Sequence, residues 1–294
     1  MKLYTFEFNG QRRIGAERGG RLVDFSASPD IPQDMISLLR GGDAAMAAAT
    51  RVQAGGTNTH AFSDVSLLAP VPRPGKILCS GLNYKSHIEE EPGSHLLDDP
   101  RFFSKLPSCV IGPGAAIRHP GQRFQVDYEV ELAIVFGTTC YRVSQQHAMR
   151  HVFGYTILHD VSARWIQFKD ANETMGKNFD TFAPMGPCLV TADEIPDPRA
   201  LRLTLRLNGQ VMQDRTNEDW CFPLPRMIEW LSMAMTLEPG DVMSTGTPAG
   251  VGCFRNPPIY LEPGDVCELS IDGIGTLVNR VEADPYTFLT QPTP

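Results

Sequence analysis

The segment QVDYEVELAIVFG, residues 125–137, constrains the fold more than any other part of the sequence. Its second half is an apolar run typical of a buried strand, whereas its first half carries Asp127, Glu129 and Glu131 at alternate positions. Side chains alternate between the two faces of a strand, so the three acids are expected on one face. Like charges on one face repel, and burying them is costly unless a cation compensates them. The strand therefore requires either such a cation or an acidic end that is open to solvent.

A divalent metal ion is the first candidate for this cation. Carboxylates at positions i and i+2 of a strand can share a hard cation such as Mg²⁺ or Mn²⁺, which prefers oxygen ligands. Asp160 ends the strand-like stretch GYTILHD and is either a third ligand or a helix N-cap. The seven histidines form no H-x-H or H-E-x-x-H pair, which favours magnesium or manganese over zinc or non-haem iron. Removing one acid is expected to relieve repulsion and to stabilise the metal-free protein.

The overall composition excludes several classes of partner. The formal net charge is −8 and no Lys/Arg cluster is present, which argues against nucleic acid and favours small molecules and metal cations. The seven cysteines contain no C-x-x-C pair, so a disulfide framework or zinc knuckle is not expected. Glu7 interrupts the apolar core that a signal peptide needs, and no run approaches the roughly 18 apolar residues of a membrane span. The sequence therefore predicts a cytoplasmic protein without membrane contact.

The chain divides at a proline-rich segment. Residues 1–70 predict a small α+β domain with strands at 2–8 and 12–17 and an alanine-rich helix at 44–52. Residues 71–75 predict an extended linker, because proline removes a backbone donor and fixes φ. The third unit, residues 76–294, has short strand-like runs separated by Gly and Pro, which favours a β-sandwich or roll.

Three further local patterns lie in that third unit. Helices are predicted at 144–153, with Ser144 as the cap, and at 223–235. The hexapeptide LEPGDV occurs at 237–242 and again at 261–266. It is interpreted as a repeated Pro-Gly turn that leads into a strand, with an ancestral duplication as the alternative.

Three more segments contain side chains that could take part in catalysis or substrate binding. In GLNYKSHIEEEPG, a helix would place His87 and Glu90 on one face, so that the carboxylate orients the imidazole as a base; a solvated acidic loop is the alternative. Residues 85–99 are further interpreted as a mobile lid. Lys177 could stabilise an enolate, and the alternative is an exposed loop lysine. Thr247 lies in the glycine-rich segment STGTPAGVG, which lacks the Lys-Ser/Thr of a P-loop and therefore does not predict nucleotide binding.

Taken together and in this order, these motifs resemble the fumarylacetoacetate hydrolase family over roughly residues 76–280. The matching stretches are KILCSGLNY, DYEVEL, DVSAR, GKNFDTFAP, TGTPAGVG and IDGIGTLVNRV. The resemblance implies a mainly β fold with α elements, a mixed β-sandwich roll, preceded here by the small N-terminal domain. It also implies a homodimer.

The resemblance further implies roles for individual residues. The metal ligands fall on Glu129, Glu131 and Asp160, with Asp127 as a flanking acid. The catalytic residues fall on His87, Glu90 and Lys177. The substrate-binding positions fall on Asn83, Tyr84, Arg164, Gln167 and Thr247. Asn178 replaces a usual serine and Trp165 replaces a frequent aspartate, and both replacements are expected to reshape the pocket.

The predicted activity is hydrolysis of a C–C bond in a small β-diketo or acylpyruvate-type acid, with Mg²⁺ or Mn²⁺ as cofactor. Decarboxylation of oxaloacetate-like acids and isomerisation or tautomerisation of 2-oxo acids are the alternatives, because the same electron sink serves all three. The small 2-oxo or diketo acid is the expected partner.

Overall fold

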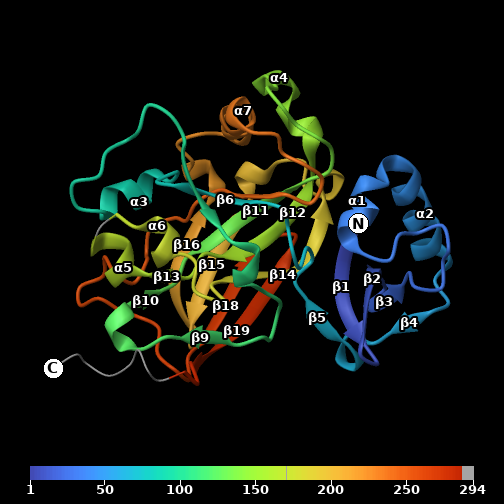
Figure 1. The fold of residues 1–294 in the computed structure, drawn as a ribbon, viewed down its shortest axis with the longest axis horizontal. Coiled ribbons are helices and arrows are strands. Elements are labelled where there is room, and N and C mark those ends of the chain that lie inside the picture. The colour runs from blue at the N-terminus through green and yellow to red at the C-terminus, as the bar shows by residue number, and fades with distance from the viewer. Residues whose placement is uncertain (170, 287–294) are drawn as a thin grey trace.

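The computed structural model describes residues 1–169 and 171–286 (Figure 1). Two sheets and a short strand pair contain most of the regular structure. Within the described residues, no helix has the length and apolar character needed to cross a membrane.

The larger sheet has twelve strands, in the order β4-β3-β2-β1-β14-β12-β11-β17-β6-β7, with β5 paired to β1 and β8 paired to β14. These strands are β1 (Lys2–Phe8), β2 (Gln11–Arg18), β3 (Arg21–Asp24), β4 (Thr59–His60), β5 (Ser66–Leu68), β6 (Ile77–Gly81), β7 (Arg101–Lys105), β8 (Val110–Ile111), β11 (Val130–Phe136), β12 (Val152–His159), β14 (Ala183–Thr191) and β17 (Val242–Ser244). The second sheet has the order β16-β15-β18-β19-β9, and β10 pairs with β13. Their strands are β9 (Ile117–His119), β10 (Val126–Asp127), β13 (Ser162–Ala163), β15 (Arg202–Leu207), β16 (Gln210–Thr216), β18 (Val266–Ile271) and β19 (Gly275–Ala283).

Helices lie around these sheets. The α-helices are α1 (Met35–Arg40), α2 (Gly42–Gly55), α3 (Lys85–Glu90), α4 (Gln145–Ala148), α5 (Arg164–Lys169), α6 (Glu173–Gly176) and α7 (Leu224–Ala234). Short 3₁₀ turns are η1 (Phe62–Asp64), η2 (Pro107–Cys109), η3 (Gln122–Phe124), η4 (Met149–His151), η5 (Ala192–Glu194), η6 (Pro198–Ala200) and η7 (Asn217–Asp219). The predicted helix at 144–153 is limited to α4 and η4, and the Ser144 side chain makes no capping bond to the helix backbone.

The strand β11 is buried along its whole length and packs into two hydrophobic clusters. Leu132 and Ile134 belong to the cluster that also contains Leu205 of β15, so the two sheets share one core. Ala133 and Val135 face the second cluster, which includes residues of α1 and α2. Covering both faces explains the continuous apolar run in the sequence, and the predicted mainly β fold with α elements is confirmed.

The N-terminal elements continue the larger sheet. β1 pairs with β14, and the blue strands β1–β3 and helices α1 and α2 form one end of the molecule (Figure 1). Residues 71–75 contain no helix or strand. The division into residues 1–70, a linker and 76–294 stays a prediction.

The LEPGDV repeat has one local role in both copies. The Oδ2 atom of Asp241 accepts from the N–H of Glu238 at 2.8 Å, and the Oδ2 atom of Asp265 accepts from the N–H of Glu262 at 2.8 Å. Each aspartate therefore closes its own Pro-Gly turn. Asp241 does more, because its carboxylate also accepts from the backbone N–H (2.9 Å) and the Nζ (2.8 Å) of Lys76, next to β6.

This difference predicts unequal stability effects for two identical substitutions. Asp241 is 2% exposed and accepts three partly buried hydrogen bonds, so Asp241→Ala is expected to lower the free energy of unfolding by about 1–3 kcal/mol. Asp265→Ala removes the same turn contact and a hydrogen bond from the Asn208 amide (2.8 Å) at a more exposed position, and is the matched control. Urea denaturation of both variants measures the difference, and equal losses would contradict the tethering role of Asp241.

Candidate active site

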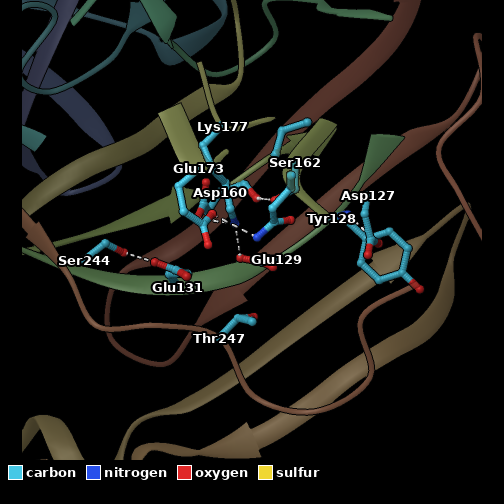
Figure 2. Close-up of polar contacts among 12 residues, drawn as sticks. Asp127, Tyr128, Glu129, Glu131, Asp160, Ser162, Glu173, Lys177, Ser244 and Thr247 are labelled. Atoms are coloured by element: carbon cyan, nitrogen blue, oxygen red, sulfur yellow. Dashed lines mark hydrogen bonds and ion pairs between the residues drawn. The ribbon is translucent and has the colours of Figure 1, made fainter. Parts of the chain in front are cut away.

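Glu129, Glu131 and Asp160 lie close together where the neighbouring strands β11 and β12 meet. β11 and β12 are antiparallel, and Val130 lies opposite His159, so residues just outside the two strand ends are adjacent. The N–H of Asp160 donates to the backbone oxygen of Glu129 at 3.0 Å, which fixes the two chain segments together. Figure 2 shows Glu129, Asp160 and Lys177 pointing toward one another, with Glu131 close by.

Asp127 does not join this group. Residues 128–129 lie between β10 and β11, but the Arg164 guanidinium contacts both Asp127 (2.9 Å) and Glu129 (2.5 Å), so the single face of three acids stays a prediction. Asp127 accepts from the N–H groups of Gly252 (2.8 Å) and Cys253 (3.0 Å) and from Nε of Arg164 (2.9 Å). It therefore anchors the loop after β17, and its place apart from the other acids is visible in Figure 2.

Buried cations of the protein itself compensate the acids. The Lys177 ammonium lies 3.0 Å from Oε2 of Glu129 and 2.8 Å from Oδ2 of Asp160. Arg164 Nη2 lies 2.5 Å from Oε1 of Glu129, and Lys105 Nζ lies 2.7 Å from Oδ1 of Asp160. All five side chains are at most 5% exposed, so the alternative of a solvated acidic end is excluded.

The two glutamates are in opposite electrostatic environments. Burial alone would raise the pKa of Glu129, but the charges of Lys177 and Arg164 outweigh burial and lower this pKa to about 2. Glu131 has no cation in contact within the described residues, and it accepts a hydrogen bond from the Ser244 hydroxyl. Burial, followed by the charges of Asp160 and Glu129, raises the pKa of Glu131 well above its ordinary value. Glu131 is therefore the carboxyl of the cluster that can take up or release a proton.

The donor set suits a hard divalent cation. Glu131 and Asp160 offer oxygen atoms that lie within 4.8 Å of each other and of the Cys79 sulfur. Burial, more than the nearby charges of Asp160 and Glu131, raises the pKa of the Cys79 thiol. A protonated thiol is a poor ligand, so carboxylate oxygens dominate the donor set and fit Mg²⁺ or Mn²⁺.

His87 and Glu90 form the expected contact. They lie one turn apart on α3, and Nδ1 of His87 is 2.7 Å from Oε1 of Glu90. The other oxygen of Glu90 accepts from the N–H of Gly250 at 2.7 Å, so the glycine-rich loop after β17 fixes the carboxylate. His87 is 8% exposed and already lines the cavity described below. The proposed movement of residues 85–99 stays a prediction.

One cavity of about 240 Å³ brings these groups together. Its lining consists of Ser80, Gly81, Leu82, His87, Glu91, Arg101, Phe103, Glu129, Glu131, Arg164, Gln167, Phe168, Ala171, Glu173, Lys177, Thr247 and Phe254. Arg164, Gln167 and Thr247 line this cavity, and their contact with substrate stays a prediction. Thr247 Oγ1 donates to the backbone oxygen of Val130 at 3.0 Å, which holds this loop against β11.

Asn83 and Tyr84 lie elsewhere, which corrects their expected contact with substrate. Asn83 is fully buried, and its amide bonds the backbone oxygen of Thr245 (2.9 Å) and the N–H of Phe222 (2.9 Å). The Tyr84 hydroxyl donates to the side chain of Asn217. These polar atoms are bound to the protein, so both residues position the turn before α3.

The two departures from the family pattern also lie outside the cavity lining. Trp165 packs edge-on against Phe124 with ring centroids 6.0 Å apart, and the Arg123 guanidinium lies 4.4 Å from its ring. Asn178 donates to the backbone oxygen of Ser104 at 3.0 Å and thereby links the segment after Lys177 to β7. Neither residue reshapes the cavity directly.

Sequence reasoning missed the residues that reach the site from other segments. Lys105 ends β7 and also donates to the backbone oxygen of Lys177 at 2.5 Å. Ser244 reaches Glu131 from β17. Glu173 accepts from Nε2 of Gln167 at 3.0 Å. The one usable signal was a lysine, Lys105, in the strand-like run RFFSK, two residues after Phe103.

The matching family model is that of the fumarylacetoacetate (FAA) hydrolase C-terminal region, and it covers residues 76–282. The chain belongs to the fumarylacetoacetate hydrolase family. The fold and the family predicted from the motifs are therefore confirmed.

Named relatives of this family are similar over most of the chain. A mitochondrial oxaloacetate tautomerase FAHD2A of Bos taurus is 40% identical over 266 residues, covering 90% of this chain and 84% of the relative. The oxaloacetate tautomerase YisK of Bacillus subtilis is 42% identical over 229 residues, covering 77% and 76%. A maleylpyruvate hydrolase from Sphingobium, solved with manganese(II) and pyruvate, has a TM-score of 0.82 at 31% identity, covering 97% and 100%. The names of these relatives support the interpretation of this chain as an enzyme that acts on a small acid. One of the relatives, the maleylpyruvate hydrolase, binds manganese(II) in its structure.

The charge pairing predicts opposite stability effects for two glutamate variants. Glu129→Gln leaves Lys177 and Arg164 with less negative charge in a buried site and is expected to destabilise the metal-free protein by about 3–5 kcal/mol. For Glu129, the charge pairs thus predict destabilisation, in place of the stabilisation expected from the sequence. Glu131→Gln removes no partner of a cation and is expected to leave stability unchanged or raised. Denaturation in EDTA tests this, and an equal loss in both variants would exclude the proposed pairing.

The same site predicts a pH dependence of stability. Because the folded protein holds the Glu131 proton above the ordinary pKa of 4.5, the folded state binds more protons than the unfolded chain in that range. The contribution of Glu131 to stability is therefore greatest below pH 4.5 and is lost as the pH rises through the raised pKa. As the pH rises from 4.5 through the raised pKa, the metal-free wild type should lose stability relative to Glu131→Gln, so the difference between the two should grow. A difference that is constant with pH would contradict the raised pKa.

Proposed function

We propose that the protein is a divalent-metal-dependent enzyme that interconverts the keto and enol forms of a small 2-oxo acid of the oxaloacetate type. The main support is one cavity that is lined by His87, which contacts Glu90, and by Glu129, Glu131 and Lys177 of the carboxylate–ammonium cluster. The bovine and Bacillus relatives that carry the name oxaloacetate tautomerase support the same reaction. Among the activities expected from the sequence, tautomerisation was an alternative to hydrolysis, and it is now preferred.

Tautomerisation requires a base at the carbon next to the 2-oxo group and a proton donor or electrophile at its oxygen. With Nδ1–H of His87 donated to Glu90, the Nε2 lone pair is available to accept the carbon-bound proton. Lys177 does not serve as this base. Burial alone would lower the pKa of Lys177, but the charges of Asp160 and Glu129 outweigh burial and raise it. Lys177 therefore stays protonated and donates hydrogen bonds to the developing enolate.

Glu129, Glu131 and Asp160 are the residues proposed to hold Mg²⁺ or Mn²⁺. When bound there, the ion would act as a Lewis acid toward the 2-oxo group and the adjacent carboxylate. Gln167 and Thr247 line the same cavity and are proposed to orient the substrate. The homodimer remains a proposal from the family resemblance, and the cytoplasmic location remains a proposal from the sequence composition.

C–C bond hydrolysis of an acylpyruvate is the second candidate. It is favoured by the similarity to the maleylpyruvate hydrolase that was solved with manganese(II) and pyruvate. In this reaction His87 would take a proton from water rather than from carbon, and Lys177 would again stabilise the enolate. Assays of oxaloacetate enolisation, oxaloacetate decarboxylation and acylpyruvate cleavage on one preparation separate the reactions. Turnover of acylpyruvates alone would reject the tautomerase.

Metal binding is predicted to release a proton. Glu131 must lose its proton to become a ligand, so the apparent affinity for Mn²⁺ should rise with pH until Glu131 is ionised in the metal-free protein. Calorimetry in two buffers of different ionisation enthalpy measures the proton released. Asp265→Asn, which changes an acid outside the cluster, should behave as wild type. Equal heats in both buffers would exclude Glu131 as the proton source.

The role of His87 predicts a selective loss of rate. His87→Ala should lower the rate of tautomerisation by about 10²- to 10⁴-fold, the usual share of general acid–base catalysis, and should retain Mn²⁺ binding. The matched control is His95→Ala, in the same loop region but exposed to solvent. If the two variants enolise oxaloacetate equally fast, His87 is not the base.

A further inference from the structure

The cavity has an uneven distribution of positive charge. Arg164 has all three of its guanidinium nitrogens engaged, with Asp127 at 2.9 Å, Gln167 at 2.9 Å and Glu129 at 2.5 Å. The Lys177 ammonium is held by two carboxylates. Both cations thus pair with acids at the floor of the site. The remaining N–H of Lys177 is assigned to the enolate oxygen in the proposed function, so neither cation is assigned to a second substrate carboxylate.

Arg101 differs from both. Its Nη2 donates to Oε1 of Glu173 at 2.9 Å, and within the described residues its Nε and Nη1 have no hydrogen-bond partner. Its side chain is 49% exposed, and it lines the same cavity as Glu129 and Lys177. Arg101 is thus, in the part of the chain that the structure describes, the lining cation with unused donors.

The backbone directs this side chain over the cavity. Arg101 begins β7 directly opposite Gly81 of β6, and both residues line the cavity. A Cβ atom on Gly81 would lie only 3.8 Å from Cδ of Arg101, so the arginine side chain lies across the glycine. Glu173 in turn is held by Nε2 of Gln167 at 3.0 Å. The position of Arg101 is therefore defined by its neighbours on two sides.

The ion pair with Glu173 does not prevent a second use of Arg101. A partly exposed ion pair contributes little to stability, and a guanidinium can donate to two carboxylates through different edges. Without Arg101, an anion at this rim would meet the acids Glu91 and Glu173 and the phenyl rings of Phe168 and Phe254. Arg101 therefore decides whether this end of the cavity accepts a negative charge.

We propose that Arg101 is the specificity residue that binds a second carboxylate of the substrate. This inference rests on the proposed function, because it places the 2-oxo acid end at Glu129, Glu131 and Asp160. The reacting carbon then lies near His87, and the distal carboxylate reaches the guanidinium fork of Arg101. Arg101 would thereby be the residue that makes the site prefer a 2-oxo dicarboxylic acid, such as oxaloacetate, over a 2-oxo monocarboxylic acid.

A matched pair of ligands tests the inference without requiring turnover. 2-Oxoglutarate and 2-oxopentanoate have the same number of carbons and differ in a terminal carboxylate or methyl group. With Mn²⁺ present, wild type should bind 2-oxoglutarate more tightly. Arg101→Gln should weaken 2-oxoglutarate binding by about 10- to 100-fold, as expected for loss of a charge-assisted hydrogen bond, and should leave 2-oxopentanoate binding unchanged. Arg101→Lys should retain part of the preference.

Arg118→Gln is the control for net charge. Arg118 is 43% exposed and has one ion pair, with Glu282 at 3.0 Å, but it does not line the cavity. This variant should keep the wild-type ligand preference. Equal binding of the two ligands by wild type, or equal weakening of both by Arg101→Gln, would overturn the inference. Failure of oxaloacetate enolisation with an intact ligand preference would instead reject the proposed reaction alone.

Discussion

The ammonium of Lys177 between Glu129 and Asp160 is the interaction on which the site depends. An isolated buried carboxylate is too costly to stay ionised, so the ends of β11 and β12 can approach only if cations accompany them. Lys177 provides this cation, and Lys105 holds both the Asp160 carboxylate and the backbone oxygen of Lys177. The position of Lys177 is therefore fixed by the same contacts that offset the cost of burying the charged Glu129 and Asp160.

This charge pairing also separates the chemical roles. A lysine held by two carboxylates keeps its proton and is a donor, whereas an imidazole with one nitrogen bound to a carboxylate keeps a free lone pair and is a base. His87 is the group in the second situation. Glu131 differs from both. Because no cation of the protein contacts it within the described residues, its pKa is raised, and it is the acid expected to lose a proton when a divalent ion binds. In the proposed function, one cavity would thus combine a fixed donor, a base and an adjustable metal ligand.

The sequence predicted the parts of the site that depend on local spacing. His87 and Glu90 lie at i and i+3 of one helix, and Glu129 and Glu131 flank one strand residue, so their proximity follows from helix and strand geometry. Lys105 could not be predicted in the same way, since its contact with Asp160 joins β7 to the end of β12 across the sheet. The hydrogen bonds of Asp127 to the N–H groups of Gly252 and Cys253 could not be predicted either, because they join segments about 125 residues apart. Long-range pairing, rather than local pattern, decides which cation meets which acid.

The floor and the rim of the cavity are under different constraints. The floor belongs to buried strand ends, where a changed charge leaves a partner unpaired and costs folding energy. The rim is built from β7, which is an edge strand, and from the short helices α5 and α6, where side chains are partly exposed. Substitution at Arg101 is therefore expected to cost little stability. If the proposed reaction uses the floor and Arg101 binds the distal end of the substrate, substrate preference can change at the rim without disturbing the buried charge pairs.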